Sequence, residues 1–197
     1  MTTPPQRTNP NNRCQPWCPA VVAFVAGPMI ILLHETGHYL AGRAVGFRPT
    51  FHFAEVKFAA SQLSERAPQV FAAGGPAVEA TLTVVGLLWL ATRRRHRRNA
   101  PSTFLDWVAT VMAGASGRWL RVRLGGTPND ETLLSSSFGW PSWMLGALLL
   151  PLAIVALTSV VLLHGPGQRL VPFITALIAG VSGVALWVHV LGPWLLP

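Results

Sequence analysis

Five apolar runs separated by polar segments dominate the 197-residue sequence. They cover residues 20–45, 70–92, 104–120, 143–163 and 170–194. A helix needs about 20 residues to cross the hydrocarbon core of a bilayer, and only a helix or a closed barrel satisfies its own backbone in lipid. The pattern therefore predicts an all-α integral membrane protein with about five transmembrane helices.

The polar segments before and after the first run differ in character. Residues 1–19 are rich in Pro, Asn and Thr, which predicts a disordered polar N-terminal segment. Within the linker at 47–69, residues 50–58 alternate between aromatic and polar side chains, with the period of two that is typical of a β-strand. We therefore expect a short membrane-associated strand or β-hairpin after the first helix.

The composition excludes a soluble globular protein. Hydrophobic residues make up 51% of the chain and charged residues 11%, against about 25% charged residues in ordinary soluble domains. Although the formal net charge is +8, in a membrane protein such an excess favours loop cations that face anionic lipid headgroups. Membrane lipid is thus an expected partner and nucleic acid is not, and the sequence leaves the oligomeric state open.

The two cysteines, Cys14 and Cys18, lie in the polar N-terminal segment. Their spacing is not that of a redox or zinc motif, and two thiols alone do not complete a tetrahedral zinc site. Solvent-side thiols or a local disulfide outside the cytosol are the favoured interpretations.

The sharpest chemical signal is His34-Glu35-Thr36-Gly37-His38 in the second half of the first apolar run. On a helix, residues four apart share a face, so His34 and His38 can bind one metal ion together, and neutral imidazole suits Zn²⁺. Glu35 can take a proton from metal-bound water. Ionisable groups inside a membrane span are costly and by default mark function.

A catalytic zinc usually has a third protein ligand, and the chain contains only seven acidic residues. Topology favours Asp130, because crossing the second and third spans returns the chain to the side of His38. Asp106 begins the third span on the opposite side, where its spacing from Thr103 predicts a capping box. Glu79 and Glu131 remain alternatives for the third ligand.

These motifs resemble the site-2 proteases, a family of intramembrane zinc metalloproteases. Residues 34–42 match the extended first motif of that family, and Ala73-Gly74-Gly75-Pro76 matches its Gly-Pro motif. The resemblance implies a three-helix metalloprotease core with its ligand loop over residues 20–141, followed by two additional transmembrane helices over residues 142–197.

The resemblance also implies a function: hydrolysis of peptide bonds in transmembrane protein substrates, known as regulated intramembrane proteolysis, with Glu35 assisting the attack of zinc-bound water. The family's β-element holds an extended substrate. The expected substrate-binding residues are Phe51, Phe53, Gly75, Pro76 and Asn129. The implied location is multi-pass in a bacterial or archaeal plasma membrane.

The sequence leaves the function, the substrate and the membrane orientation open. A metal-free relative acting as a chaperone or regulator, and a membrane metal transporter, are alternative functions. Neither the substrate nor the activity of the chain follows from the sequence. The cluster of basic residues from Arg93 to Arg98 predicts a cytosolic location for the end of the second span, whereas the resemblance places the metal site, at the other end, toward the cytosol.

Overall fold

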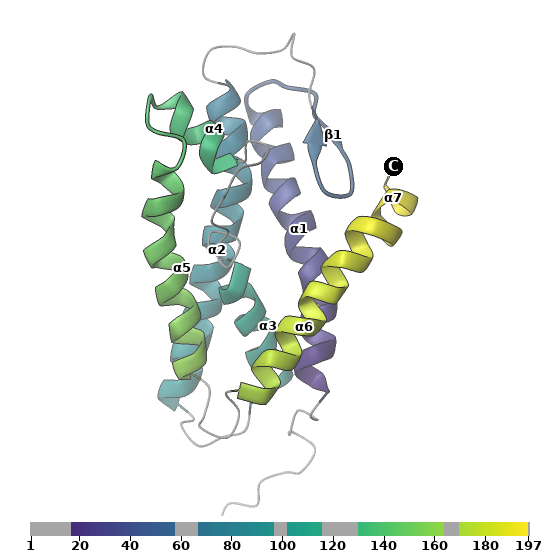
Figure 1. The fold of residues 1–197 in the computed structure, drawn as a ribbon, viewed down its shortest axis with the longest axis vertical. Helices are drawn as coiled ribbons and strands as arrows, with labels where there is room; N and C mark the ends of the chain where they lie inside the picture. The colour runs from purple at the N-terminus through teal and green to yellow at the C-terminus, as the bar shows by residue number, and fades with distance from the viewer. Residues whose placement is uncertain (1–16, 58–66, 97–101, 116–129, 164–169, 197) are drawn as a thin grey trace, which may run out of the picture.

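The computed structural model describes residues 17–57, 67–96, 102–115, 130–163 and 170–196. In these ranges the protein is mostly helical, with one small sheet (Figure 1). In chain order the elements are α1 (Cys18–Ala44), β1 (Thr50–Phe51), β2 (Val56–Lys57), α2 (Ala67–His96), α3 (Phe104–Ala113), α4 (Asp130–Ser137), α5 (Met144–Leu163), α6 (Leu170–Leu186), the π-helix η5 (Trp187–Leu191) and α7 (Gly192–Leu195).

Among the described residues, three helices are long and apolar enough to cross a membrane: Cys18–Ala44, Pro68–Arg95 and Val171–Leu195. They coincide with the first, second and fifth apolar runs. Two further apolar helical stretches, Phe104–Ala113 and Ala147–Leu162, are shorter. The structure thus supports a membrane protein with three candidate spans in its described part, and the five spans expected from the sequence stay a prediction.

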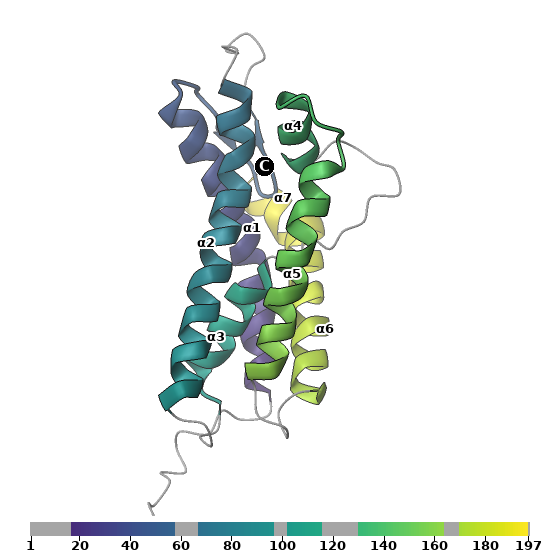
Figure 2. The same ribbon diagram turned by 90° about the vertical axis from the view of Figure 1, so that its left-hand side faces the viewer.

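The long helices pack through glycines that let their backbones approach closely. α1 lies beside α2 and is crossed by α6, as the two perpendicular views show (Figures 1 and 2). A Cβ atom on Gly37 of α1 would overlap the carbonyl of Gly74 on α2, and one on Gly183 of α6 would overlap the carbonyl of Phe24 on α1. Small residues are the usual means of close helix packing in lipid, where burial against water cannot drive association.

The helix α3 begins as the sequence predicts but ends earlier. Thr103 caps it with the expected capping box, in which the Asp106 carboxylate accepts a hydrogen bond from the Thr103 backbone at 2.7 Å. Asp106 also lies 3.3 Å from Nε of Arg93 and accepts from the indole of Trp89 at 3.2 Å. The helix ends at Ala113 with Gly114 as its C-cap, and the rest of the predicted third span, from residue 116, lies outside the described residues.

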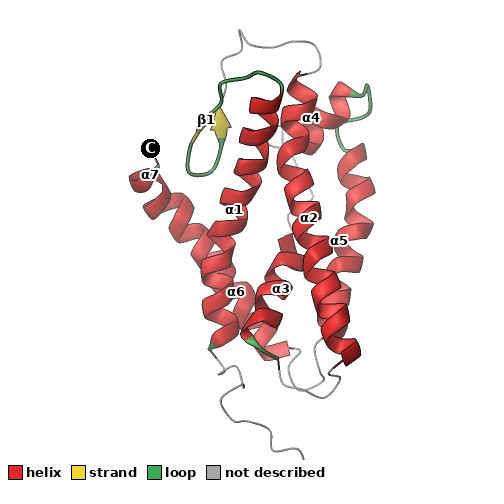
Figure 3. Ribbon diagram, turned by 180° about the vertical axis from the view of Figure 1, so that it is seen from behind, coloured by secondary structure: helices red, strands yellow, loops and turns green. Residues whose placement is uncertain are grey.

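The alternating segment forms a β-hairpin (Figure 3). Its strands are antiparallel, with Thr50 opposite Lys57 and Phe51 opposite Val56. The hairpin packs against α1 near the helix's C-terminal end, where the ring of Phe51 meets that of Tyr39. The indole of Trp187 on η5 donates a hydrogen bond to the Phe53 carbonyl at 2.8 Å. The hairpin is therefore held between the first and last long helices.

The two cysteines are only partly described. Cys18 opens α1, is buried and is disulfide-bonded. Cys14 and the rest of the predicted N-terminal segment up to residue 16 lie outside the described residues. A disulfide at Cys18 agrees with the expectation of a local disulfide, which persists in oxidising compartments outside the cytosol.

Candidate metal centre

His34 and His38 lie one turn apart on α1 and are both buried, with 5% and 4% of their surfaces exposed. The helix brings their side chains onto one face, as the spacing predicts. Their Nε2 atoms are 3.0 Å apart, and their rings meet edge to face with centroids 4.7 Å apart. The two nitrogens thus point at a common position.

One face of α2 supports both imidazoles through residues four apart: Phe71, Gly75 and Glu79. The carbonyl of Phe71 lies 2.7 Å from Nδ1 of His38, and because a carbonyl only accepts, Nδ1 must be the donor. The Phe71 ring stacks on the same imidazole at a centroid distance of 5.0 Å. Oε1 of Glu79 lies 3.1 Å from Nδ1 of His34. Each imidazole is therefore contacted at Nδ1 by α2, which leaves Nε2 directed toward its partner.

Gly75 lies directly against the imidazoles of His34 and His38, where there is no room for a side chain. A Cβ atom there would overlap Cε1 and Nε2 of His34 and would come within 2.5 Å of Nε2 of His38. The Gly-Pro motif predicted from the sequence therefore lies against the two histidines, with Pro76 following Gly75 inside α2. Only glycine lets the α2 backbone approach the imidazoles this closely.

Asp130 completes the group from the first residue of α4. Its Oδ2 atom is 3.1 Å from Nε2 of His34 and 3.4 Å from Nε2 of His38, and its side chain is 20% exposed. The helix α4 lies at the same end of the molecule as the C-terminal half of α1 (Figure 1). The structure thus brings His34, His38 and Asp130 together across 96 residues of sequence.

The geometry of this triangle fits a metal ion. The three ligand atoms lie within 4.8 Å of one another, and the closest approaches are 3.0, 3.1 and 3.4 Å. Tetrahedral bonds of about 2.0–2.1 Å place neighbouring ligand atoms about 3.3 Å apart. Two imidazole nitrogens and one carboxylate oxygen are also the donor types that zinc accepts. A buried His-His-Asp group of this shape could hold a metal ion.

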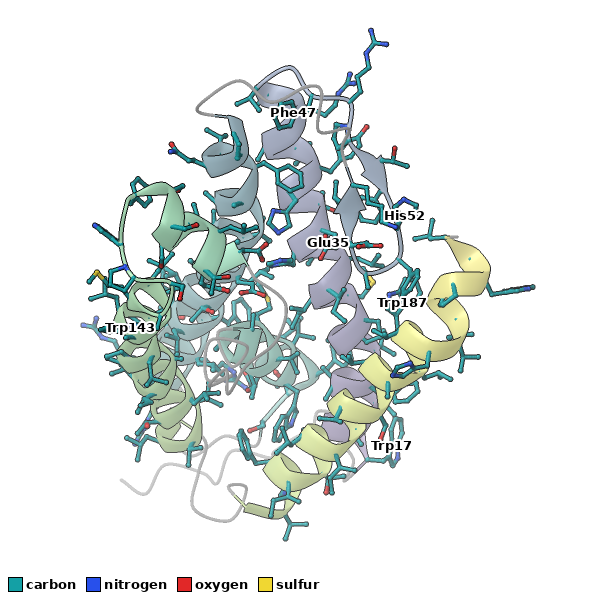
Figure 4. All side chains as sticks on the ribbon, turned by 45° about the horizontal axis from the view of Figure 1, so that its top comes forward. Trp17, Glu35, Phe47, His52, Trp143 and Trp187 are labelled. Atoms are coloured by element: carbon teal, nitrogen blue, oxygen red, sulfur yellow. The ribbon has the colours of Figure 1, made fainter. Side chains whose placement is uncertain are left out.

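The other acidic residues considered from the sequence occupy different positions. Glu35 follows His34 directly and is 8% exposed; Figure 4 shows it midway along α1. Glu79 contacts the Nδ1 side of His34, away from the triangle. Glu131 is buried in α4 with 6% of its surface exposed. Among the residues that the structure describes, the clustered group of potential ligands comprises His34, His38 and Asp130.

The predicted substrate-binding residues fall in two places. Phe51 lies in strand β1 and Phe53 in the turn that follows, while Gly75 and Pro76 lie on α2 beside the histidines. Asn129 lies outside the described residues. The hairpin packs against α1, the same helix that carries His34 and His38 of the metal centre.

Sequence reasoning missed two features of this region. One is the contact of Glu79 with His34, for which a signal was present: Glu79 is four residues after Gly75, so the helix period already places it on the face of the Gly-Pro motif. The other is the hydrogen bond from Trp187 to Phe53, which joins residues 134 apart, and no local pattern marks it.

Comparison with models of protein families, with curated proteins and with solved structures finds no match.

Proposed function

We propose that the protein is an intramembrane zinc metalloprotease that hydrolyses peptide bonds of transmembrane protein substrates. The observation that carries this proposal is the buried triangle of His34, His38 and Asp130, with the acid Glu35 next to the first ligand. Two of its three residues, His34 and His38, lie on α1, a helix that is long and apolar enough to cross a membrane.

The position of the triangle along α1 supports cleavage within the bilayer. At about 1.5 Å per residue, the 27 residues of α1 extend roughly 40 Å, which exceeds a hydrocarbon core of about 30 Å. His34 lies ten residues before Ala44, or roughly 15 Å from that end of the helix. With α1 centred on the bilayer, His34 lies roughly 10 Å inside the hydrocarbon boundary. The proposal also keeps the five spans that the apolar runs of the sequence predict, with α1, α2 and α3 as the catalytic core.

The residues of the site have distinct roles in this proposal. His34, His38 and Asp130 would hold the zinc, which when bound supplies a Lewis acid that polarises the scissile carbonyl and acidifies a water molecule. Glu35 accepts the proton of the attacking water as the new carbon–oxygen bond forms. It then delivers that proton to the amine nitrogen as the carbon–nitrogen bond breaks. Water and peptide thus become a carboxylic acid and an amine, and no covalent enzyme intermediate is required.

The hairpin is the proposed docking element for the substrate. A transmembrane helix must unwind before hydrolysis, because its scissile peptide is otherwise shielded by its own turns. An unwound segment has free backbone donors and acceptors, which pair with an open strand edge by β-addition. The strands Thr50–Phe51 and Val56–Lys57 supply such edges beside α1.

The test is cleavage of a model transmembrane substrate by the full-length protein in detergent or in vesicles. We expect cleavage with zinc bound, loss of cleavage when a chelator removes it, and recovery when zinc returns. Glu35→Gln is expected to keep its zinc and to lose about 10²- to 10⁴-fold in rate, the usual contribution of a general base.

The matched control is Asp106→Asn, the same acid-to-amide change at another buried side chain, because Asp106 caps α3 and contacts Arg93 and Trp89, away from the metal centre and the hairpin. This variant is expected to cleave at the wild-type rate. Cleavage that persists in the chelator, or a Glu35→Gln variant that cleaves normally, would contradict the proposal.

A further inference from the structure

Glu79 is an acidic side chain that the proposed mechanism does not use. It is 1% exposed and lies within α2, a helix long and apolar enough to cross a membrane. Burial of a carboxylate away from water is costly unless another group compensates for it. A carboxylate at this position therefore calls for a partner of opposite charge or a strong hydrogen-bond donor.

The described contact of Glu79 with the metal centre is made through His34. Its Oε1 atom lies 3.1 Å from Nδ1, while Nε2 on the opposite side of the same ring faces His38 and Asp130. A neutral imidazole carries one N–H, and a carboxylate is only an acceptor. The Glu79 carboxylate thus favours the proton at Nδ1 and leaves the lone pair of Nε2 for a metal ion. The contact between Glu79 and His34 is a charge contact, whereas the Phe71 carbonyl accepts a hydrogen bond from Nδ1 of His38 at 2.7 Å and so fixes the same tautomer there.

We propose that Glu79 is a positioning residue of the metal centre, which fixes the tautomer and orientation of His34 without itself binding the metal. This inference rests on the metal site of the proposed function. Such outer contacts raise the basicity of a metal-bound histidine and hold its ring in place. Together with Asp130, the Glu79 carboxylate also balances the two positive charges of a divalent cation, which lowers the cost of holding that cation inside the bilayer.

The position of Glu79 distinguishes this role from that of a fourth ligand. A ligand would have to share the point at which the Nε2 atoms of His34 and His38 converge. The Glu79 carboxylate contacts the other nitrogen of the His34 ring instead. Gly75, one turn earlier on α2, occupies the space directly against Nε2.

The test measures the affinity of the purified full-length protein for zinc by competition with a chelator, in two variants of graded severity. Glu79→Leu removes the acceptor and is expected to weaken binding about 10- to 100-fold, the usual cost of losing an outer contact. Glu79→Gln keeps an oxygen acceptor of the same shape and is expected to lose less. Both should bind one metal at saturation, with a cobalt-loaded absorption spectrum like that of the wild type.

The control is Thr83→Val, which replaces another buried polar side chain one turn further along α2 and should leave affinity unchanged. Wild-type affinity in Glu79→Leu, equal losses in the two Glu79 variants, or an equal loss in Thr83→Val would overturn the positioning role. A changed cobalt spectrum at saturation would make Glu79 a ligand instead. Since binding is measured without substrate, a protein that binds zinc but cleaves nothing would refute the proposed protease and leave this inference standing.

Discussion

Replacement of Gly75 by alanine is a direct probe of the packing around the metal centre. The added methyl group would occupy the space between α2 and the two imidazoles, against Nε2 of both His34 and His38. Neither ring can retreat freely, because each is contacted at Nδ1 by α2, His38 by the Phe71 carbonyl and His34 by Glu79. The substitution therefore acts on the two atoms that would bind the metal.

The expected effect follows from the distances. The new Cβ atom would lie 2.5 Å from Nε2 of His38, whereas ordinary contact begins at 3.4 Å, so this ring must move by about 0.9 Å. Functional side chains must usually be held within about 0.5 Å of their productive geometry. We therefore expect zinc affinity to fall on the order of 10- to 100-fold, as for other disturbances next to metal ligands. A misplacement of about 1 Å should also slow cleavage on the order of 100-fold.

The assay is zinc binding by chelator competition, with thermal unfolding measured in parallel. Gly114→Ala is the matched control, because a Cβ atom there meets nothing within 4 Å and the residue's φ of −74° suits alanine. Gly37→Ala shows the effect of disrupting the fold, since its Cβ atom would overlap the backbone of Gly74. Wild-type zinc affinity in a folded Gly75→Ala variant would refute the described packing.

Two further predictions concern the hairpin and the membrane orientation. Trp187→Phe removes the N–H that donates to the Phe53 carbonyl, so the hairpin should lose about 0.5–1.5 kcal/mol of local stability. Amide hydrogen exchange in the hairpin should then be faster in the variant than in the wild type. Unchanged protection of these amides would show that this hydrogen bond does not hold the hairpin in place. Cys18 is disulfide-bonded, which favours an N-terminal end of α1 outside the cytosol. A reporter that is active only outside the cytosol should therefore be active when fused after His96, and a reporter active only in the cytosol at that point would reverse the orientation.

Much of the fold followed from local patterns in the sequence. The apolar runs predicted α1 and α2 to within a few residues, and the Thr103–Asp106 spacing predicted the capping box that the structure contains. The predicted third span is borne out only in its first part, because apolar composition does not reveal where an α-helix ends, and its last residues lie outside the described ones. Its helix ends before Gly114, and glycine is a poor helix former.

The candidate site was predictable where helix periodicity or topology controlled it. The spacing of His34 and His38 placed both on one face, and Asp130 lies beside them as expected, although the third span that was expected to return the chain is described only up to residue 115. The sequence does not predict whether Glu79 binds the metal itself or orients His34 as a metal ligand. That depends on which nitrogen of the His34 ring the Glu79 carboxylate contacts. That is decided by the way α1 and α2 pack, which no single segment of the sequence specifies.

The most direct test of the central claim is the metal content of the purified protein and its variants. The wild type is expected to contain one zinc ion per chain, and His34→Ala, His38→Ala and Asp130→Ala are each expected to lose it. Asp106→Asn should keep it, because Asp106 is a carboxylate even more buried than Asp130, with 6% against 20% of its side chain exposed, and it contacts Arg93 and Trp89 at the other end of α2. Unchanged zinc content in Asp130→Ala would contradict the proposed ligand set, and unchanged content in all three variants would contradict the site itself.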